Sequence, residues 1–300
     1  MVAFPYRCAG RKYAEIFGFG MRKASCIRYG GRRQKKWRDL ANFHAQNDSF
    51  NRVCMKTIPL LMASMWLWLG SLAQDTFSIV AIDTLTGEIG SAGASCLDAR
   101  AIEGGAAIIS DLLPGVGAVH TQSYYLAGNQ QAAQRWLRAG ISAQALLDSV
   151  VAGDAEGDPS RRQYGVLTVD SSGQVAVAAY TGDSCLAWHG HRTGATYSVQ
   201  GNILLGPQVL DSMEVRFRRS EGSLPERLMA ALQGANIPGA DSRCLEEGVS
   251  SQSAFLRVAR PTDSAMDIHL ELIVDRTEEG EEPIDVLQLH YDTWRLMQGR

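Results

Sequence analysis

The sequence predicts an α/β (α+β) fold, a four-layer αββα sandwich of two mainly antiparallel sheets with helices on both outer faces. Strand-like segments come as hairpins joined by short turns, and helix-like segments follow them in pairs. Helices alternating singly with strands would instead indicate a doubly wound parallel sheet. With 300 residues, 45% of them hydrophobic, the chain is long enough for one or at most two domains with a sizeable core.

Four strands are expected before the first helix. The first alternates hydrophobic with small or polar residues, and the second returns after the turn Thr84–Gly87, as in a β-hairpin. The breaker Leu113–Gly115 separates the third strand from the fourth. The four strands are expected at residues 76–83, 88–96, 105–110 and 116–122.

The hydrophobic period then changes to that of two helices. The first covers residues 129–139, and the second begins after the N-cap Ser142 and ends near Gly153. Hydrophobic residues of the second helix recur on one face, at Ala143, Leu146, Leu147, Val150 and Val151. That face is expected to lie on a sheet.

The rest of the chain returns to strands and helices. Further strands are expected at residues 163–170, 174–181, 253–260 and 266–276. The first two are joined by the hairpin turn Ser171–Gly173, and a Gly- and His-rich loop follows them. Helices are expected from Pro207, over residues 224–233 and from Pro283. Ser223 and Glu226 form a capping box for the middle one.

The amino-terminal segment differs in charge from the rest. Residues 1–56 hold 13 Lys or Arg against 3 Asp or Glu, whereas the remaining residues hold 16 against 29. A nucleic-acid-binding arm is one interpretation of such a segment. The segment shows no sustained period, and we favour residues 1–54 as a basic extension ahead of the true translation start, without a nucleic-acid partner.

Residues 55–73 have the order of a secretory signal peptide. Met55 and Lys56 precede the apolar run of residues 58–70, and small residues follow up to Ala73. A membrane anchor is the alternative, but this run is short against the roughly 20 residues that span a bilayer. We therefore expect a secreted or periplasmic protein without stable membrane insertion, whose residues 74–300 form a single domain.

The exported domain would carry Cys96, Cys185 and Cys244, of which two can pair in an oxidising compartment. Three pairings are possible, and Cys185 with Cys244 is preferred because both lie beside turn-like segments. The cysteine spacing includes no CxxC, so a structural zinc site is not expected. His189 and His191 have the H-x-H spacing of some metal sites, and His120 could be a third ligand. Loop histidines more commonly bond to backbone, so no metal is expected.

Several segments resemble the DUF1028 family, a set of uncharacterised proteins placed among the Ntn (N-terminal nucleophile) hydrolases. They are TFSIVAID, GVGAVHTQ, the AYTG segment and above all YSVQGNILLGPQVLDSM, and the resemblance extends from Thr76 to about Trp294. It implies an αββα fold and hydrolysis of an amide bond. No cofactor is implied.

The resemblance implies that Thr76 is the nucleophile once it is the first residue. Its own α-amino group, with a pKa of about 7.7–8.0, would deprotonate the hydroxyl. Asn202 or the Gly201 backbone is expected to stabilise the oxyanion. The substrate-binding residues are expected among Gln200, Thr181, Gly182, Asp183, His191, Gln122 and Arg192, the last as a partner for a substrate carboxylate.

One feature departs from cytosolic relatives, which begin Met-Thr. Here Gln74 and Asp75 stand between Ala73 and Thr76, so either a second cut exposes Thr76, or signal cleavage falls next to it, or Thr76 is not a nucleophile. The leading hypothesis is an exported Ntn-type amidohydrolase acting on a small amide or peptide, including C–N bonds other than peptide bonds. The alternative is a non-catalytic protein that binds peptides or cell-wall fragments at residues 182–202. A homodimer is expected by analogy.

Overall fold

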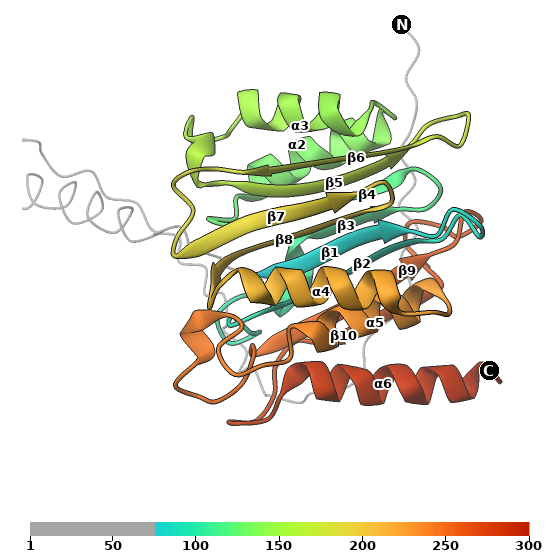
Figure 1. The fold of residues 1–300 in the computed structure, drawn as a ribbon. Coiled ribbons are helices and arrows are strands. Elements are labelled where there is room, and N and C mark those ends of the chain that lie inside the picture. Colours follow the sequence, from blue (N-terminus) through green and yellow to red (C-terminus); the bar gives the residue numbers. More distant parts are fainter. Residues whose placement is uncertain (1–75, 300) are drawn as a thin grey trace, which may run out of the picture. The chain divides into compact units, whose positions relative to one another are not determined.

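Two antiparallel sheets form the centre of the computed structural model, which describes residues 76–299 (Figure 1). The predictions made for residues 1–75 lie outside these residues. The first sheet has the order β10-β9-β2-β1-β8-β7, formed by β1 (Phe77–Ile82), β2 (Ile89–Ser95), β7 (Trp188–Gly194), β8 (Tyr197–Leu204), β9 (Ser253–Ala259) and β10 (Leu270–Val274). The second has the order β3-β4-β5-β6, formed by β3 (Ser110–Leu113), β4 (Gly117–Gln122), β5 (Gln163–Val169) and β6 (Val175–Thr181).

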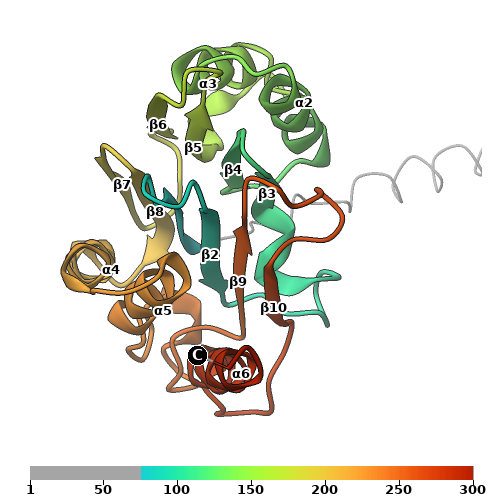
Figure 2. The same ribbon diagram turned by 90° about the vertical axis from the view of Figure 1, so that its right-hand side faces the viewer.

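Helices cover the outer face of each sheet, which confirms the predicted αββα sandwich (Figure 2). Helices α2 (Ala127–Arg138) and α3 (Ala143–Ala152) lie on the four-stranded sheet, whereas α4 (Pro207–Arg219), α5 (Leu224–Gly234) and α6 (Pro283–Met297) lie on the six-stranded sheet. Ser142 accepts the Ala145 N–H at the start of α3, and the capping box of Ser223 and Glu226 opens α5, as predicted.

The layer between the sheets is hydrophobic at one end of β1 and polar at the other. Phe77, Ile79 and Ala81 of β1 face the helices and join the largest hydrophobic cluster. The alternate residues face the second sheet, where Val80 and Ile82 meet hydrophobic residues of β2, β4 and β5, namely Ile89, Ala118 and Leu167. Ser78, nearer the start of β1, instead bonds to a polar side chain of β4.

Several segments differ from the predicted elements. The strand β3 covers Ser110–Leu113, after the strand expected at residues 105–110, and no strand was predicted over β8. Residues 105–109 form a 3-10 helix, not a strand, because the chain turns at Gly104 and Gly105, whose φ angles are 84° and 53°. The predicted Gly- and His-rich loop contains the strand β7. Among the described strands β7 is an edge strand that pairs with β8 alone. It is half-exposed along its length and lacks the alternation that identifies a strand with one buried face.

The predicted disulfide between Cys185 and Cys244 is wrong. Cys244 pairs with Cys96, over a Cα–Cα distance of 5.8 Å. The end of β2 and the segment around Asp241 lie side by side, since the Cys96 N–H donates to the Asp241 carboxylate over 2.9 Å. Cys185 is a buried thiol near the start of β5, with its Sγ 3.5 Å from the Arg162 carbonyl oxygen.

Among the described helices, none combines the length and hydrophobicity required to cross a bilayer.

Candidate functional site

Thr76 lies immediately before β1, at the polar end of the inter-sheet layer. Its carbonyl oxygen accepts the Asn202 backbone N–H over 3.3 Å and the Gln122 side-chain N–H over 2.9 Å. The residue is fully buried, and its Oγ1 has no hydrogen-bond partner among the described residues. The backbone of Thr76 is therefore held from both sheets, whereas its hydroxyl is not used by the fold.

Gln163, the first residue of β5, orients the amides around Thr76. Its Nε2 lies 2.9 Å from the Gly201 carbonyl oxygen and 3.0 Å from that of Gly190. Because carbonyl groups only accept hydrogen bonds, the Gln163 nitrogen must face them and its Oε1 must accept. The donors to Oε1 are Gln122 Nε2, at 2.8 Å, and Asn202 Nδ2, at 3.0 Å. This one amide thus sets the direction of two others.

Asn202 is the cross-strand neighbour of Thr76, since Phe77 pairs with Gly201 in the β1–β8 ladder. Its Nδ2 donates one hydrogen bond to Gln163 Oε1, and its Oδ1 is buried without a hydrogen-bond partner among residues 76–299. A buried acceptor without a donor costs about 1–3 kcal/mol. A hydroxyl and an amide oxygen that both lack partners therefore come from facing positions of neighbouring strands.

The strands that carry Gln122 and Asn202 end in strained backbone. Ser123 and Tyr124, directly after Gln122, have φ angles of 60° and 46°, and Ile203, directly after Asn202, has a φ angle of 52°. Non-glycine residues adopt such angles at a cost of about 1–3 kcal/mol each, and they cluster at functional sites. The strain marks this end of the sandwich as a candidate site.

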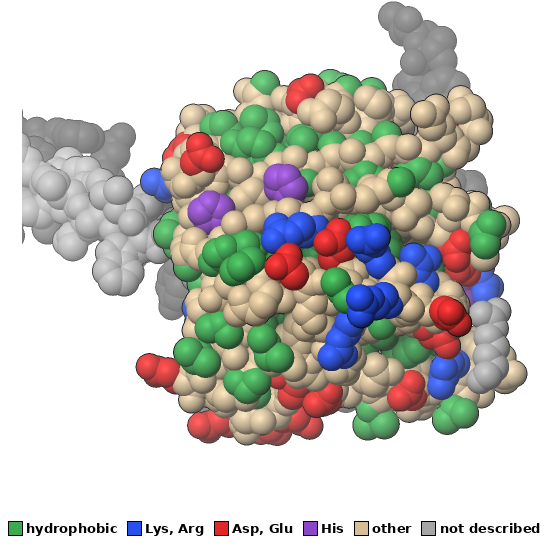
Figure 3. Space-filling model, viewed as in Figure 1, with side chains coloured by type: hydrophobic (Ala, Val, Ile, Leu, Met, Phe, Trp, Pro, Cys, Tyr) green, Lys and Arg blue, Asp and Glu red, His purple; other side chains and the backbone are tan. Residues whose placement is uncertain are grey.

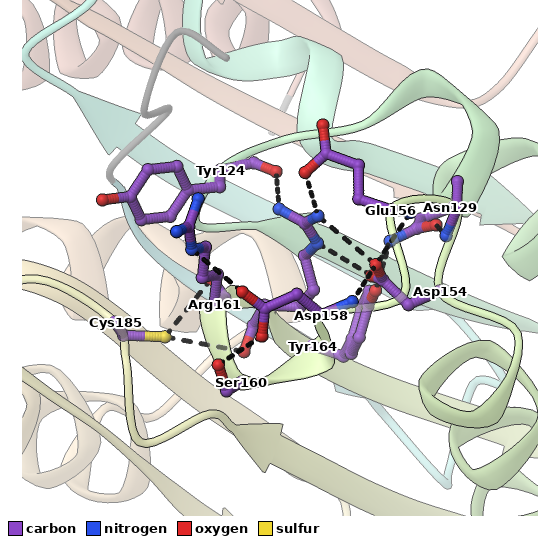
Figure 4. A network of polar contacts seen from close by, with 11 residues as sticks. Tyr124, Asn129, Asp154, Glu156, Asp158, Ser160, Arg161, Tyr164 and Cys185 are labelled. Atoms are coloured by element: carbon purple, nitrogen blue, oxygen red, sulfur yellow. Dashed lines mark hydrogen bonds and ion pairs between the residues drawn. The ribbon is translucent and has the colours of Figure 1, made fainter. Parts of the chain in front are cut away.

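A buried ion pair supports the strained segment and the start of β5 (Figure 4). Arg162 precedes Gln163, and its Nε contacts the Asp154 carboxylate at 2.8 Å, with both side chains almost fully buried. Its Nη1 donates to the Tyr124 carbonyl oxygen over 2.7 Å. Burial opposes ionisation of Asp154, but hydrogen bonds from Arg162 and Asn129 lower its pKa to about 2. Arg162 therefore links Tyr124, in the strained segment after Gln122, to the start of β5, where Gln163 orients the Gln122 amide.

Thr181 and His191 continue the polar site toward the surface. Thr181 Oγ1 lies 2.9 Å from Gln163 Nε2 and 2.8 Å from His191 Nδ1. Burial, followed by the charge of Arg192, lowers the pKa of the half-buried His191. Arg192 forms a surface ion pair with Asp211 at 2.8 Å. Figure 3 shows histidines beside basic and acidic groups over β7, the strand that contains His191 and Arg192.

The structure brings most predicted site residues together and separates others. Hydrogen bonds link Thr76, Gln122, Gly201, Asn202, Thr181 and His191, largely through Gln163, while Gln200 bonds to Ser78. Gly182 donates to the Arg162 carbonyl oxygen over 2.9 Å, behind the site. Asp183 is exposed, and Arg192 already has an acidic partner. The prediction missed Gln163 and Arg162, because neither residue type is distinctive at a strand start.

The other histidines lie apart from one another. His189 Nδ1 is 3.0 Å from the Ala187 carbonyl oxygen, whereas His120 is fully buried between the sheets. Within residues 76–299, no group of three or more His, Cys, Asp or Glu is placed to hold a metal ion. A cavity of about 540 Å³ lies elsewhere, along β3 and near β10, and is lined by Asp111 and Arg257 among others.

Comparisons with known proteins give a matching family and a solved structure of similar fold. The model of DUF1028, a family of unknown function, matches residues 76–287. The chain is similar to a Silicibacter pomeroyi protein whose crystal structure bears the same family description, with a TM-score of 0.57 and 24% identity over 73% of this chain and 88% of that one. Anbu, the ancestral beta-subunit from Yersinia bercovieri, aligns at a TM-score of 0.35 and 12% identity over 74% and 95% of the chains, too low to support an argument. No curated protein matches the chain.

Proposed function

The chain belongs to the DUF1028 family, and from that premise we propose that it is an exported Ntn-type amidohydrolase that cleaves a small amide or peptide bond through Thr76. The observation that carries this proposal is the pairing of a held backbone with an unused hydroxyl. Thr76 is fixed through its carbonyl oxygen, while its Oγ1 and the neighbouring Asn202 Oδ1 have no partner among the described residues.

A cut between Asp75 and Thr76 would complete the site. The freed α-amino group, with a pKa of about 7.7–8.0, takes the proton of Oγ1 as the oxygen attacks the substrate carbonyl carbon. The same amino group returns the proton to the leaving amine as the C–N bond breaks. Water then hydrolyses the ester on Oγ1, releasing the acid and restoring the hydroxyl.

The proposal gives Asn202 the role of an acceptor. One N–H of its Nδ2 group is donated to Gln163 Oε1, whereas Oδ1 is the side-chain atom without a hydrogen-bond partner among the described residues. An α-amino group on Thr76 supplies the N–H that Oδ1 lacks, which would hold the nitrogen lone pair toward Oγ1. Gly201 contributes its carbonyl oxygen to the orientation of Gln163.

The first test is the intact mass of the mature, exported protein. A chain that begins at Thr76 is expected in the active form, and a chain that begins at Gln74 in every molecule, without hydrolysis, would support the binding protein instead. The processed protein is then screened against p-nitroanilides of short acyl groups and amino acids.

The second test compares threonine variants. Thr76→Ala is expected to abolish hydrolysis, whereas Thr193→Ala, at an exposed position of β7, leaves it unchanged. Because alanine has no nucleophile, residual activity of about 10% or more in a folded, processed Thr76→Ala protein would overturn the proposal. Thr76→Ser keeps a hydroxyl and is expected to retain measurable activity.

A further inference from the structure

The hydrogen bonds behind Thr76 form a chain in which each donor and acceptor can be assigned. The assignment starts with Gln122 and Ser78. Gln122 Nε2 contacts two acceptors, Thr76 O and Gln163 Oε1, so Gln122 Oε1 faces the opposite way. Ser78 Oγ lies 2.6 Å from that Oε1, and since the amide oxygen only accepts, Ser78 must donate. A serine hydroxyl has one hydrogen, which is now used.

Ser78 must therefore accept its other two hydrogen bonds. Gln200 Nε2 lies 2.7 Å from Ser78 Oγ, and its Oε1 accepts the Ser198 hydroxyl over 2.7 Å. His120 Nδ1 lies 2.8 Å from Ser78 Oγ. Two lone pairs of Ser78 receive two donors, so the proton of His120 is on Nδ1.

The other ring nitrogen of His120 has to accept. His120 is fully buried, and desolvation, followed by the charge of Arg257, lowers its pKa to about 3. The neutral ring has no proton for Nε2, which lies 2.6 Å from Ser91 Oγ, so Ser91 donates to it. Ser91 in turn receives the Ser110 hydroxyl at 2.7 Å. The direction of donation runs through Ser110, Ser91, His120, Ser78, Gln122 and the Thr76 carbonyl oxygen.

We propose that His120 is a positioning residue for Thr76, acting through Ser78 and Gln122 with its proton on Nδ1. Its role in catalysis rests on the proposed function of Thr76, but its protonation and its control of Gln122 do not. Both ring nitrogens are committed to serines, so His120 takes no proton from the reacting groups. It fixes the hydroxyl direction of Ser78, which keeps the Gln122 N–H on the Thr76 carbonyl oxygen.

The opposite tautomer would disturb the site. With the proton on Nε2, Nδ1 could accept from Gln200 Nε2, which lies 3.2 Å away, but its lone pair would face the Ser78 oxygen at 2.8 Å unless the only hydrogen of Ser78 turned toward His120. Gln122 Oε1 would then lose its donor, and the Gln122 amide would lose the contact that holds it toward Thr76. A displacement of about 1 Å at reacting groups can reduce the rate by about 10²-fold.

Nitrogen NMR of the folded, ¹⁵N-histidine-labelled protein tests the tautomer without any substrate. His120 is expected to show a protonated Nδ1 and an unprotonated Nε2 from pH 5 to pH 8. A proton on Nε2, or a doubly protonated ring in this range, would contradict the assignment whatever the protein hydrolyses.

Variants of His120 test the control of Gln122. In His120→Asn the side-chain amide N–H can replace the Nδ1–H, whereas His120→Leu removes the donor, and His290→Leu on the exposed part of α6 is the matched control. In His120→Asn, the Gln122 side-chain NH₂ signals are expected to keep chemical shifts that differ from those of a free amide and to keep slow hydrogen exchange with solvent. In His120→Leu they are expected to lose both properties. Unchanged Gln122 signals in folded His120→Leu would overturn the proposal, with or without hydrolysis.

Kinetics with an acyl p-nitroanilide add the catalytic readout. His120→Leu is expected to lower kcat about 10²-fold with KM changed less than about threefold, and His120→Asn to recover most of kcat. If Gln122 responds as expected but wild-type protein cleaves no amide, the proposed function fails and the positioning role stands. If wild-type protein is active and His120→Leu keeps full kcat, the positioning role fails alone.

Discussion

Asn202 and Thr76 face each other across β1 and β8, where the Asn202 backbone N–H donates to the Thr76 carbonyl oxygen over 3.3 Å. The same residue leaves its side-chain Oδ1 without a partner in the described part of the chain. The backbone N–H of Asn202 thus holds Thr76 in place. In the proposed mature protein, the side-chain Oδ1 of Asn202 would accept a hydrogen bond from the α-amino group of Thr76.

Asn202→Leu, which has a similar volume, is expected to lower kcat of the processed protein by 10- to 100-fold, because the α-amino group loses its acceptor. Stability should fall by about 0.5–1.5 kcal/mol, since Gln163 Oε1 loses one of its two donors and keeps Gln122 Nε2. Steady-state kinetics and denaturant unfolding measure the two effects. Asn236→Leu, after the end of α5, is the control, and equal kcat values for Asn202→Leu and wild type would contradict the assigned role.

Arg162→Leu is expected to destabilise the protein by about 3–5 kcal/mol, because Asp154 would remain buried with its charge unpaired. The double variant Arg162→Leu with Asp154→Leu should recover part of this loss. Chemical denaturation of the four proteins gives the coupling free energy. Additive effects of the two single variants would show that the pair is not coupled.

The same ion pair predicts acid sensitivity. The pKa of Asp154 is lowered to about 2 in the folded protein, so its contribution is complete above the pKa of the unfolded chain, about 3.9, and is lost as pH falls toward 2. Arg162→Leu should flatten the stability profile between pH 4 and pH 2. Unfolding curves recorded at several acidic pH values test this, and parallel wild-type and variant profiles would argue against the assignment.

Asp111 predicts the opposite pH dependence. Burial raises its pKa to about 6, and its Oδ2 has no partner among the described residues. A raised carboxyl pKa means that stability is lost as pH rises through about 6. Asp111→Asn should therefore be more stable than wild type by about 1–2 kcal/mol at pH 8, with the gain disappearing near pH 4. Asp267→Asn, an exposed neighbour at the same cavity, should change little in thermal melts at either pH.

The disulfide between Cys96 and Cys244 closes a loop with a sequence separation of 148 residues. Replacing both cysteines by alanine should lower the free energy of unfolding by about 2–5 kcal/mol. Reductant should destabilise the wild-type protein by a similar amount and leave the double variant unchanged. Cys185→Ala serves as the control, since that cysteine lies outside the disulfide. A Cys185→Ala protein that alone lost its response to reductant would refute the pairing.

The sequence predicted the helices and strands that are determined by residues close to one another in the chain. The N-cap Ser142 and the capping box of Ser223 and Glu226 mark helix starts within a few residues, and the β1–β2 hairpin follows from alternation around a turn. The strand β7 lacks such a signal because an edge strand need not hide one face. The apolar run at residues 105–109 fits a strand or a helix equally well, and only the turn at Gly104 decides it.

Long-range contacts set the parts that the sequence could not predict. The family resemblance pointed to Thr76, Gln122 and Asn202, but the directions of their hydrogen bonds depend on Gln163, which reaches them only when the two sheets stack. The cysteine pairing failed for the same reason. Cys96 and Cys244 meet because the end of β2 lies beside Asp241, a proximity that no spacing along the chain records.

The division of the inter-sheet layer into a hydrocarbon half and a polar half also bears on how the sandwich aligns. Aliphatic contacts such as those of Val80 and Ile82 tolerate small slips of one sheet over the other, and cores patterned only by size lose uniqueness before stability. Amides, hydroxyls and an imidazole with fixed donors and acceptors accept a single superposition. The polar residues around Thr76 therefore also fix the position of one sheet relative to the other. Mutations there would make this relative position less well defined while each sheet stayed intact.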